Sequence, residues 1–156
     1  MIVPPMWDLF GAEHLPYRLL LLARMIDRQA ARQLNAAFGL TLAEWRVLAF
    51  VCASGPSSAS AIGRSGGIDR AEISRAVTRL EDKKLATRAA DAANRRKLII
   101  SPTRKGRALF AEVIADRRAF FRALLQDVPE ADRLVVERSM RQMALQLQEL
   151  DPPASG

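Results

Sequence analysis

Cysteine and histidine are almost absent from this chain of 156 residues, which has one of each, Cys52 and His14. A single cysteine excludes an intrachain disulfide and a zinc site built from several cysteines, and a single histidine excludes a histidine-rich metal site. The two residues could in principle act as a nucleophile and its base. No third orienting group, glycine-rich phosphate loop or paired-carboxylate motif accompanies them, so we expect no metal, no cofactor and no catalysis.

Long apolar segments are also missing. The longest aliphatic run, from Leu19 to Ala23, lies between Arg18 and Arg24 and is far shorter than the roughly 20 residues that span a bilayer. The residues before Arg18 include no basic side chain and no continuous apolar stretch, so we expect no secretory signal. Hydrophobic residues make up 49% and charged residues 26% of the chain, as in an ordinary globular protein, and we expect a cytoplasmic location.

Positive charge is concentrated in one part of the sequence. Residues 69–107 contain twelve Lys or Arg and five Asp or Glu, whereas the other 117 residues contain twelve of each, so the net charge of +7 falls in this segment. Twenty of the 24 basic residues are Arg, whose side chain suits bidentate contacts with phosphate or guanine. Such a confined surplus predicts a polyanion-binding lobe attached to a neutral scaffold.

Residues 69–83 are predicted to form a short helix with one buried and one outward side. Ile73, Val77 and Leu80 recur at helical spacing and should pack on a core, and Asp69-x-x-Glu72 has the spacing of a capping box. The opposite side carries small, hydroxyl and guanidinium side chains, which are Ala71, Ser74, Arg75, Thr78 and Arg79. Side chains of these kinds can reach base edges and phosphates. A solvated amphipathic helix is the simpler alternative.

The preceding segments give this helix a recognisable setting. A helix over residues 41–53 opens with the capping box Thr41-Leu-Ala-Glu44. A weak helix follows over residues 58–65, and a turn at Gly66-Gly67 joins it to the helix over residues 69–83. Two short helices joined by a glycine turn have the layout of a helix-turn-helix.

The period of the apolar residues then changes from that of a helix to that of strands. Residues 85–88 and 97–101 are predicted to pair as a two-stranded hairpin around the turn Asp91-Ala-Ala-Asn94. The tip carries three basic side chains, Arg95, Arg96 and Lys97. A hairpin with a basic tip directly after a helix-turn-helix is a wing that can enter a minor groove. A solvated charged turn is the alternative.

The remaining segments are predicted to be mostly helical. Long helices are expected over residues 14–38, over residues 102–126 and, after Pro129, up to residue 150, the last with apolar spacings of four and three that suit another helix. Residues 1–13 are expected to form an irregular arm. Its apolar anchors are Met6, Trp7, Leu9 and Phe10. The predicted fold class is therefore mainly α with a small two-stranded β wing.

Several motifs together give a specific resemblance to a known family. They are Gly39-Leu-Thr-Leu-Ala-Glu-Trp-Arg-Val-Leu48, Gly55-Pro56, Ile68-Asp-Arg-Ala-Glu-Ile-Ser-Arg-Ala-Val-Thr-Arg-Leu-Glu81, Asn94-Arg-Arg96 and Thr103-Arg-Lys-Gly-Arg107. With these motifs and their spacing, residues 14–150 resemble the MarR family of bacterial winged helix-turn-helix transcriptional regulators. The resemblance implies a homodimer, formed through the N-terminal arm and the first and last two helices. Residues 1–38 and 102–156 would form the dimerisation lobe, and residues 39–101 the DNA-binding lobe, of one intertwined domain.

The resemblance also implies how double-stranded DNA is bound. A twofold dimer places two copies of the helix over residues 69–83 in successive major grooves, about 34 to 36 Å apart, so the operator is expected to be an imperfect palindrome. Ser74, Arg75 and Thr78 are the candidates for base edges, with Ala71 close to a thymine methyl group. The candidates for phosphate contacts are Ser58, Ser60, Arg70 and Arg79.

The wing residues are assigned from the family's Asp-x-Arg motif. Carried over to this sequence, the motif places Arg96 in the minor groove, with Arg95 and Lys97 near the DNA backbone. Asn94 stands where the family has the acidic residue that orients the arginine, so both Arg95 and Arg96 are candidates for the minor groove.

The family commonly responds to small aromatic or anionic ligands, bound between the two lobes, that shift the distance between the reading helices. For this chain the resemblance implies a repressor released by an effector, such as an aromatic acid or its thioester. The candidate effector residues combine a histidine, two arginines and aromatic or apolar surfaces. They are His14, Tyr17, Arg18, Met25, Trp45, Arg46 and Phe50. Simpler interpretations are a cap or surface residue for His14, an ion-pair partner for Arg46 and a core residue for Trp45.

Two alternative functions remain. Cys52 could make the protein a redox-responsive regulator, but a sensing thiol should be exposed and near cations, whereas the helical spacing of Cys52 from Trp45 and Ala49 predicts a small core residue. The other alternative is a winged-helix module that binds a protein and has no specific affinity for DNA. The surplus of seven positive charges argues against that module.

Overall fold

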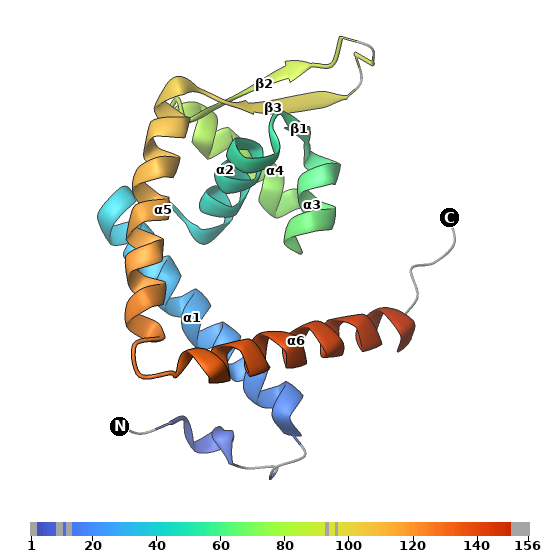
Figure 1. The fold of residues 1–156 in the computed structure, drawn as a ribbon. Coiled ribbons are helices and arrows are strands. Elements are labelled where there is room, and N and C mark those ends of the chain that lie inside the picture. The colour runs from blue at the N-terminus through green and yellow to red at the C-terminus, as the bar shows by residue number, and fades with distance from the viewer. Residues whose placement is uncertain (1–2, 9–10, 12–13, 93, 96, 151–156) are drawn as a thin grey trace. The chain divides into compact units, whose positions relative to one another are not determined.

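The computed structural model describes residues 3–8, 11, 14–92, 94–95 and 97–150 (Figure 1). The elements in chain order are η1 (Pro5–Trp7), α1 (Leu15–Phe38), α2 (Leu42–Ser54), β1 (Ser57–Ser58), α3 (Ala59–Gly66), α4 (Arg70–Asp82), β2 (Ala86–Ala90), β3 (Leu98–Pro102), α5 (Arg104–Leu124) and α6 (Glu130–Leu150). The chain divides into two compact units, residues 1–114 and 115–156, with the boundary inside α5. The mainly helical fold predicted from the sequence is confirmed, whereas the predicted division into a dimerisation lobe and a DNA-binding lobe stays a prediction.

Side-chain caps fix the first turns of α2 and α4. At α2, the Thr41 hydroxyl accepts from the Glu44 amide at 3.2 Å and the Glu44 carboxylate accepts from the Thr41 amide at 2.8 Å, so the predicted capping box is complete. At α4, the Asp69 carboxylate accepts from the Glu72 amide at 2.8 Å. The reciprocal bond, from the Asp69 amide to the Glu72 carboxylate, is not made among the described residues, so this predicted box is only half formed.

The small sheet has three antiparallel strands in the order β1-β3-β2, one more than predicted. Ser57 of β1 and Arg88 of β2 both face Ile100 of the central strand. Strand β1 has only two residues, which is too short to show the alternation by which strands are predicted. The turn of the β2–β3 hairpin is held where predicted, because the Asn94 amide donates to the Asp91 carboxylate at 3.0 Å.

The core of the first unit lies between the sheet and the short helices. Ile73, Val77 and Leu80, the residues predicted to form the inner side of α4, are all buried. They belong to one cluster with residues of α1, α2 and β3, including Leu34, Val47, Leu48, Val51 and Ile100. The core therefore fixes which side of α4 faces outward.

The first turn of α5 packs directly on the backbone before β2. The Thr103 amide donates to the Leu85 carbonyl at 3.0 Å, and a Cβ at Gly106 would overlap that same carbonyl oxygen. Only glycine allows so close an approach of a helix to a neighbouring backbone. The Thr103–Arg107 motif therefore joins the first turn of α5 to the residue just before β2.

Many apolar side chains of α1 and α6 are exposed in the single chain. On α6 they are Leu134, Val135, Val136, Met140, Leu145, Leu147 and Leu150, and on α1 they are Leu15, Leu20, Leu22 and Met25. Of the predicted arm anchors, Met6 is exposed and Trp7 half-buried, while Leu9 and Phe10 lie outside the described residues. In the described part of the chain no single helix is long and apolar enough to cross a membrane. Helices α1 and α2 taken together have the length and composition of a membrane span, but they meet at an angle of 81°.

Candidate nucleic-acid interface

The outward side of α4 carries the side chains that the sequence placed there. Arg70, Ala71, Ser74, Arg75, Thr78 and Arg79 are all exposed. The Thr78 hydroxyl donates to the carbonyl of Ser74, one turn earlier, at 3.2 Å. This bond uses the hydroxyl hydrogen and leaves the oxygen lone pairs of Thr78 available as acceptors.

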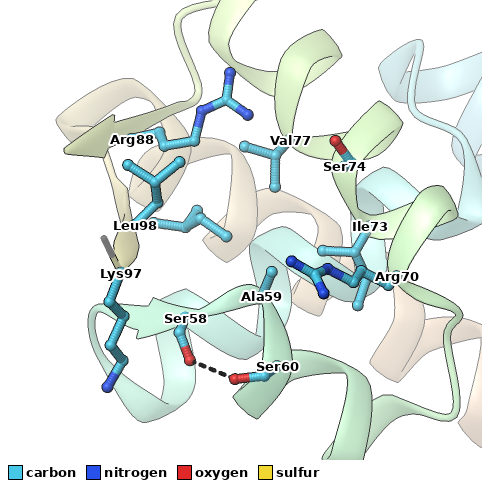
Figure 2. A pocket seen from close by; sticks show the side chains of 11 residues that line it. Ser58, Ala59, Ser60, Arg70, Ile73, Ser74, Val77, Arg88, Lys97 and Leu98 are labelled. Atoms are coloured by element: carbon cyan, nitrogen blue, oxygen red, sulfur yellow. Dashed lines mark hydrogen bonds between the residues drawn. The ribbon is translucent and has the colours of Figure 1, made fainter. Parts of the chain in front are cut away.

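A cleft of about 350 Å³ lies between α4, the start of α3 and the β2–β3 hairpin (Figure 2). Its apolar lining consists of Ala59, Ile73, Val77, Leu98 and Ile100, and its polar lining consists of Ser58, Ser60, Arg70, Ser74, Arg88 and Lys97. Arg70 points into the cleft from the α4 side, while Arg88 and Lys97 stand on the hairpin side. Three cations thus surround a concave surface beside the outward side of α4, which favours an anionic partner.

Arg88 was not predicted as a site residue. Its guanidinium forms an ion pair with Glu81 in the last turn of α4, with 2.9 Å between Nη2 and Oε2. The sequence placed Arg88 at the end of a strand, but no motif distinguished it from other surface arginines. The signal that could have found it is its position on the strand immediately following the helix with the outward arginines.

The two predicted serine contacts differ in their surroundings. Ser58 is buried at 9% exposure, and its hydroxyl caps α3 by accepting from the Ala61 amide at 3.4 Å. The Ser58 and Ser60 hydroxyls are 3.1 Å apart, the bond drawn in Figure 2. Ser60 is exposed, so of the pair it is the residue that a phosphate can approach.

A second concave surface, of about 270 Å³, lies on another flank of α4. It is lined by Thr41, Leu42 and Ala43 at the start of α2 and by Glu72, Arg75, Ala76 and Arg79 of α4. Arg75 and Arg79 therefore border one cavity, whereas Arg70 and Arg88 border the other. The helix has arginine side chains along both flanks.

The tip of the hairpin is closed by backbone hydrogen bonds. The Asp91 amide donates to the Lys97 carbonyl and the Lys97 amide to the Asn94 carbonyl, each at 2.8 Å. Arg95 and Lys97 are exposed, while Arg96 lies outside the described residues. Arg95 and Lys97 are thus exposed at the tip of a closed hairpin.

The predicted effector residues of α1 contact the N-terminal segment. The Tyr17 hydroxyl donates to the sulfur of Met6 at 3.9 Å. Arg18 donates from Nε to the Trp7 carbonyl at 2.9 Å and lies 3.4 Å from the Asp8 carboxylate. His14 is the exposed N-cap residue of α1. These contacts place the start of α1 against residues 6–8.

The predicted effector residues of α2 have other partners. Arg46 binds both carboxylate oxygens of Asp27, at 2.9 and 3.1 Å, which is the ion-pair role considered from the sequence. Trp45 stacks on Phe110 with ring centroids 5.7 Å apart, and Phe50 packs against the core. Neither concave surface beside α4 is lined by any of the seven predicted effector residues, so their assignment stays a prediction.

Cys52 packs half-buried against the core of the first unit. Burial raises the pKa of its thiol, an effect that the nearby positive charge of Arg107 only partly offsets. The thiol is therefore protonated at neutral pH and is a poor nucleophile. Among the described residues, no group of three or more His, Cys, Asp or Glu side chains could hold a metal ion.

Comparison with family models gives a match that covers the middle of the chain. The model of the MarR family matches residues 38–97, the segment from the end of α1 to the tip of the hairpin. No curated protein sequence matches the chain.

Solved structures have the same fold over most of the chain. A MarR/EmrR family transcriptional regulator from Acinetobacter sp. ADP1 has a TM-score of 0.77 at 21% identity, covering 88% of this chain and 96% of its own. BpsR of Bordetella bronchiseptica, whose DNA binding is regulated by 6-hydroxynicotinic acid, has a TM-score of 0.73 at 25% identity, covering 91% and 98%. MepR of S. aureus, solved as a DNA complex, has a TM-score of 0.74 at 20% identity, covering 85% and 96%.

The family match covers the helix-turn-helix and most of the hairpin, the elements that border the cationic cleft. MarR-family proteins are transcriptional regulators and not enzymes. The matched segment assigns residues 38–97 to the MarR family, and the fold over most of the chain is that of solved MarR-family regulators.

Proposed function

We propose that this MarR-family protein is a homodimeric repressor that binds a palindromic operator and is released by a small aromatic or anionic effector. The observation that carries the DNA-binding part is the outward side of α4, which is exposed and has arginines along both flanks. Helix α4 would lie in the major groove and the hairpin tip in the adjacent minor groove.

Each side chain of the interface has a proposed role. Ser74, Arg75 and Thr78 contact base edges, and Ala71 lies against a thymine methyl group. Phosphates are held by Ser58, Ser60, Arg70 and Arg79. To these we add Arg88, which lines the same cleft as Arg70 from its hairpin side. At the hairpin tip, Arg96 or Arg95 enters the minor groove, and Lys97 lies near the backbone.

The proposal of a homodimer is supported by the apolar surfaces of α1 and α6. Seven large apolar residues of α6 and four of α1 are exposed in the single chain, and extended apolar surfaces of this kind are characteristic of oligomer interfaces. A twofold dimer would present two copies of α4 at about 34 to 36 Å, one turn of DNA. The operator would then be an imperfect palindrome.

The effector part of the proposal is supported by BpsR, whose DNA binding is regulated by an aromatic acid. A ligand of this type needs a cation and an apolar surface, and Arg18 with Tyr17 or Arg46 with Trp45 could supply both. In the single chain these arginines bind Asp8 and Asp27, so an effector carboxylate would have to replace a protein carboxylate. Thermal-shift screening with benzoate-type and cinnamate-type acids and their thioesters tests this part, and a flat response would contradict it.

Selection of genomic fragments by the purified protein tests the DNA-binding part. A retained fragment should be released as salt rises, because each neutralised phosphate frees a counterion. With six or more phosphate contacts, affinity should fall at least ~1,000-fold between about 50 and 200 mM salt. Retention of no fragment, or binding unaffected by salt, would favour the protein-interaction module.

A further inference from the structure

Lys83 closes α4 and also contacts the junction between α1 and α2. It is the C-cap residue of α4, and its Nζ donates to the Gly39 carbonyl at 2.7 Å and to Oε2 of Glu44 at 2.8 Å. Gly39 is the C-cap of α1, and Glu44 belongs to the capping box of α2. One ammonium group therefore joins the ends of three helices.

Glu44 is fully buried, which is unusual for a carboxylate outside a functional or paired site. Its Oε2 accepts from Lys83 and from the Thr41 amide, whereas its Oε1 is buried without a hydrogen-bond partner among the described residues. A glutamine at this position can close a capping box as well as a glutamate. Capping alone therefore does not explain a buried charge, and the pairing with Lys83 does.

Other hydrogen bonds hold the C-terminal end of α4, but they connect it to α5 and not to α1 or α2. The Lys105 ammonium donates to the Lys83 carbonyl at 2.9 Å, and the Thr103 hydroxyl donates to the Lys84 carbonyl at 2.8 Å. Both attach the end of α4 to the start of α5. Among the described residues, the Lys83 side chain makes the one polar side-chain link from this end of α4 to the α1–α2 junction.

We propose that Glu44 and Lys83 are positioning residues for the reading helix. The pair fixes the direction of α4 relative to the end of α1, and a displacement of the α1 terminus at Gly39 is passed to α4 through the Lys83 side chain. The Glu44 side chain is 1% exposed and the Lys83 side chain 37% exposed, so it is the carboxylate that is buried and needs the ammonium group at one fixed place to compensate its charge. The inference rests on the proposed function, in which α4 reads DNA and α1 belongs to the dimerisation lobe.

Five variants, one of them a matched control, separate positioning from folding stability. Lys83→Met and Glu44→Gln each break the pair, and the double variant removes both charges, so no buried charge is left unpaired. Lys83→Arg keeps a cation with donors for both acceptors. Lys84→Gly is the matched control, because it removes the same charge from the next residue, whose side chain forms no described hydrogen bond or ion pair, at a backbone φ of 59° that suits glycine.

Binding to a genomic fragment retained by the wild type is the first measurement. The double variant should be close to the wild type in urea unfolding yet bind the fragment about tenfold more weakly, the worth of one well-aligned base contact. Lys83→Arg and Lys84→Gly should bind as the wild type does, and the salt dependence of the double variant should match that of the wild type. Wild-type affinity in the double variant would overturn the proposal. So would a salt slope lower by about 0.9, because it would assign Lys83 to a phosphate.

Amide hydrogen exchange without DNA is the second measurement. In the double variant, the Leu85 amide, which donates to the Leu80 carbonyl, and the Leu40 amide, which donates to the Leu34 carbonyl, should exchange faster relative to the buried Val113. Unchanged exchange at both would overturn the proposal. If the wild type retains no fragment, the proposed function fails, and hydrogen exchange still decides whether the pair couples α4 to α1.

Discussion

Arg88 on β2 and Glu81 on α4 join the hairpin to α4, with 2.9 Å between guanidinium nitrogen and carboxylate oxygen. Their side chains are 34% and 28% exposed, and a pair so accessible to water contributes only about 0 to 1 kcal/mol to stability. The effect of the pair is geometric, because it holds a cation on the side of the cleft opposite Arg70 (Figure 2).

Arg88→Ala should therefore weaken binding of every retained fragment about equally and lower the salt slope by about 1, as expected for a lost phosphate contact. Glu81→Gln is the control, because it breaks the ion pair and keeps the cation, so its salt slope should stay at the wild-type value. Gel-shift titrations at several salt concentrations measure both quantities. An Arg88→Ala variant with the wild-type affinity and slope would remove Arg88 from the interface.

Arg96→Ala should weaken binding to the same fragment by about 1 to 3 kcal/mol if Arg96 is the residue that enters the minor groove. Arg95→Ala should then cost less, because a contact near the backbone affects mainly the salt-dependent part of the affinity. Parallel gel-shift titrations compare the two variants. A larger loss for Arg95→Ala would exchange the two assignments, and wild-type affinity in both would contradict a role for the hairpin tip.

Lys84 is the one non-glycine residue with a positive φ among the described residues, at 59°. A side chain in this left-handed conformation costs about 1 to 2 kcal/mol. Glycine avoids this cost, but its greater backbone freedom in the unfolded chain offsets part of the gain. Lys84→Gly should therefore raise the free energy of unfolding by roughly 1 kcal/mol. Urea denaturation measures the change, with Lys84→Ala as the control that keeps the strain. Equal stability of the glycine and alanine variants would contradict the explanation.

The parts of the fold that depend on neighbouring residues could be predicted from the sequence. The Thr41–Glu44 box, the Asp69 cap and the buried side of α4 all follow from spacings of three or four residues. Strand β1 could not be predicted, because its two residues are strand only through pairing with Ile99 and Ile100, more than forty positions later in the sequence.

The site could be predicted only in part for the same reason. The outward side of α4 is set by local periodicity, and the sequence identified it. Arg88 was missed because only the folded structure brings it into the cleft, which is formed by α3, α4 and the hairpin. The partners of Arg18 and Arg46 are 10 and 19 residues away, so local spacing in the sequence could not show these ion pairs.

Cys52 should be insensitive to oxidants at neutral pH. Burial raises the pKa of its thiol, so the thiolate fraction is lower than in an exposed cysteine and grows only when the pH rises above the ordinary range of a thiol. Alkylation by iodoacetamide at pH 7 should be slow in the folded protein and fast in urea. Loss of DNA binding after peroxide treatment, prevented by Cys52→Ala, would instead establish the redox-responsive alternative.

The central claim is that a twofold pair of α4 helices, each with its wing, binds duplex DNA. Hydroxyl-radical footprinting of the purified protein on a retained fragment tests it most directly. The account predicts two protected half-sites related by a dyad, with centres one helical turn, about 34 to 36 Å, apart, and loss of both in high salt. A single unsymmetrical protected site, or no protection on any retained fragment, would contradict it.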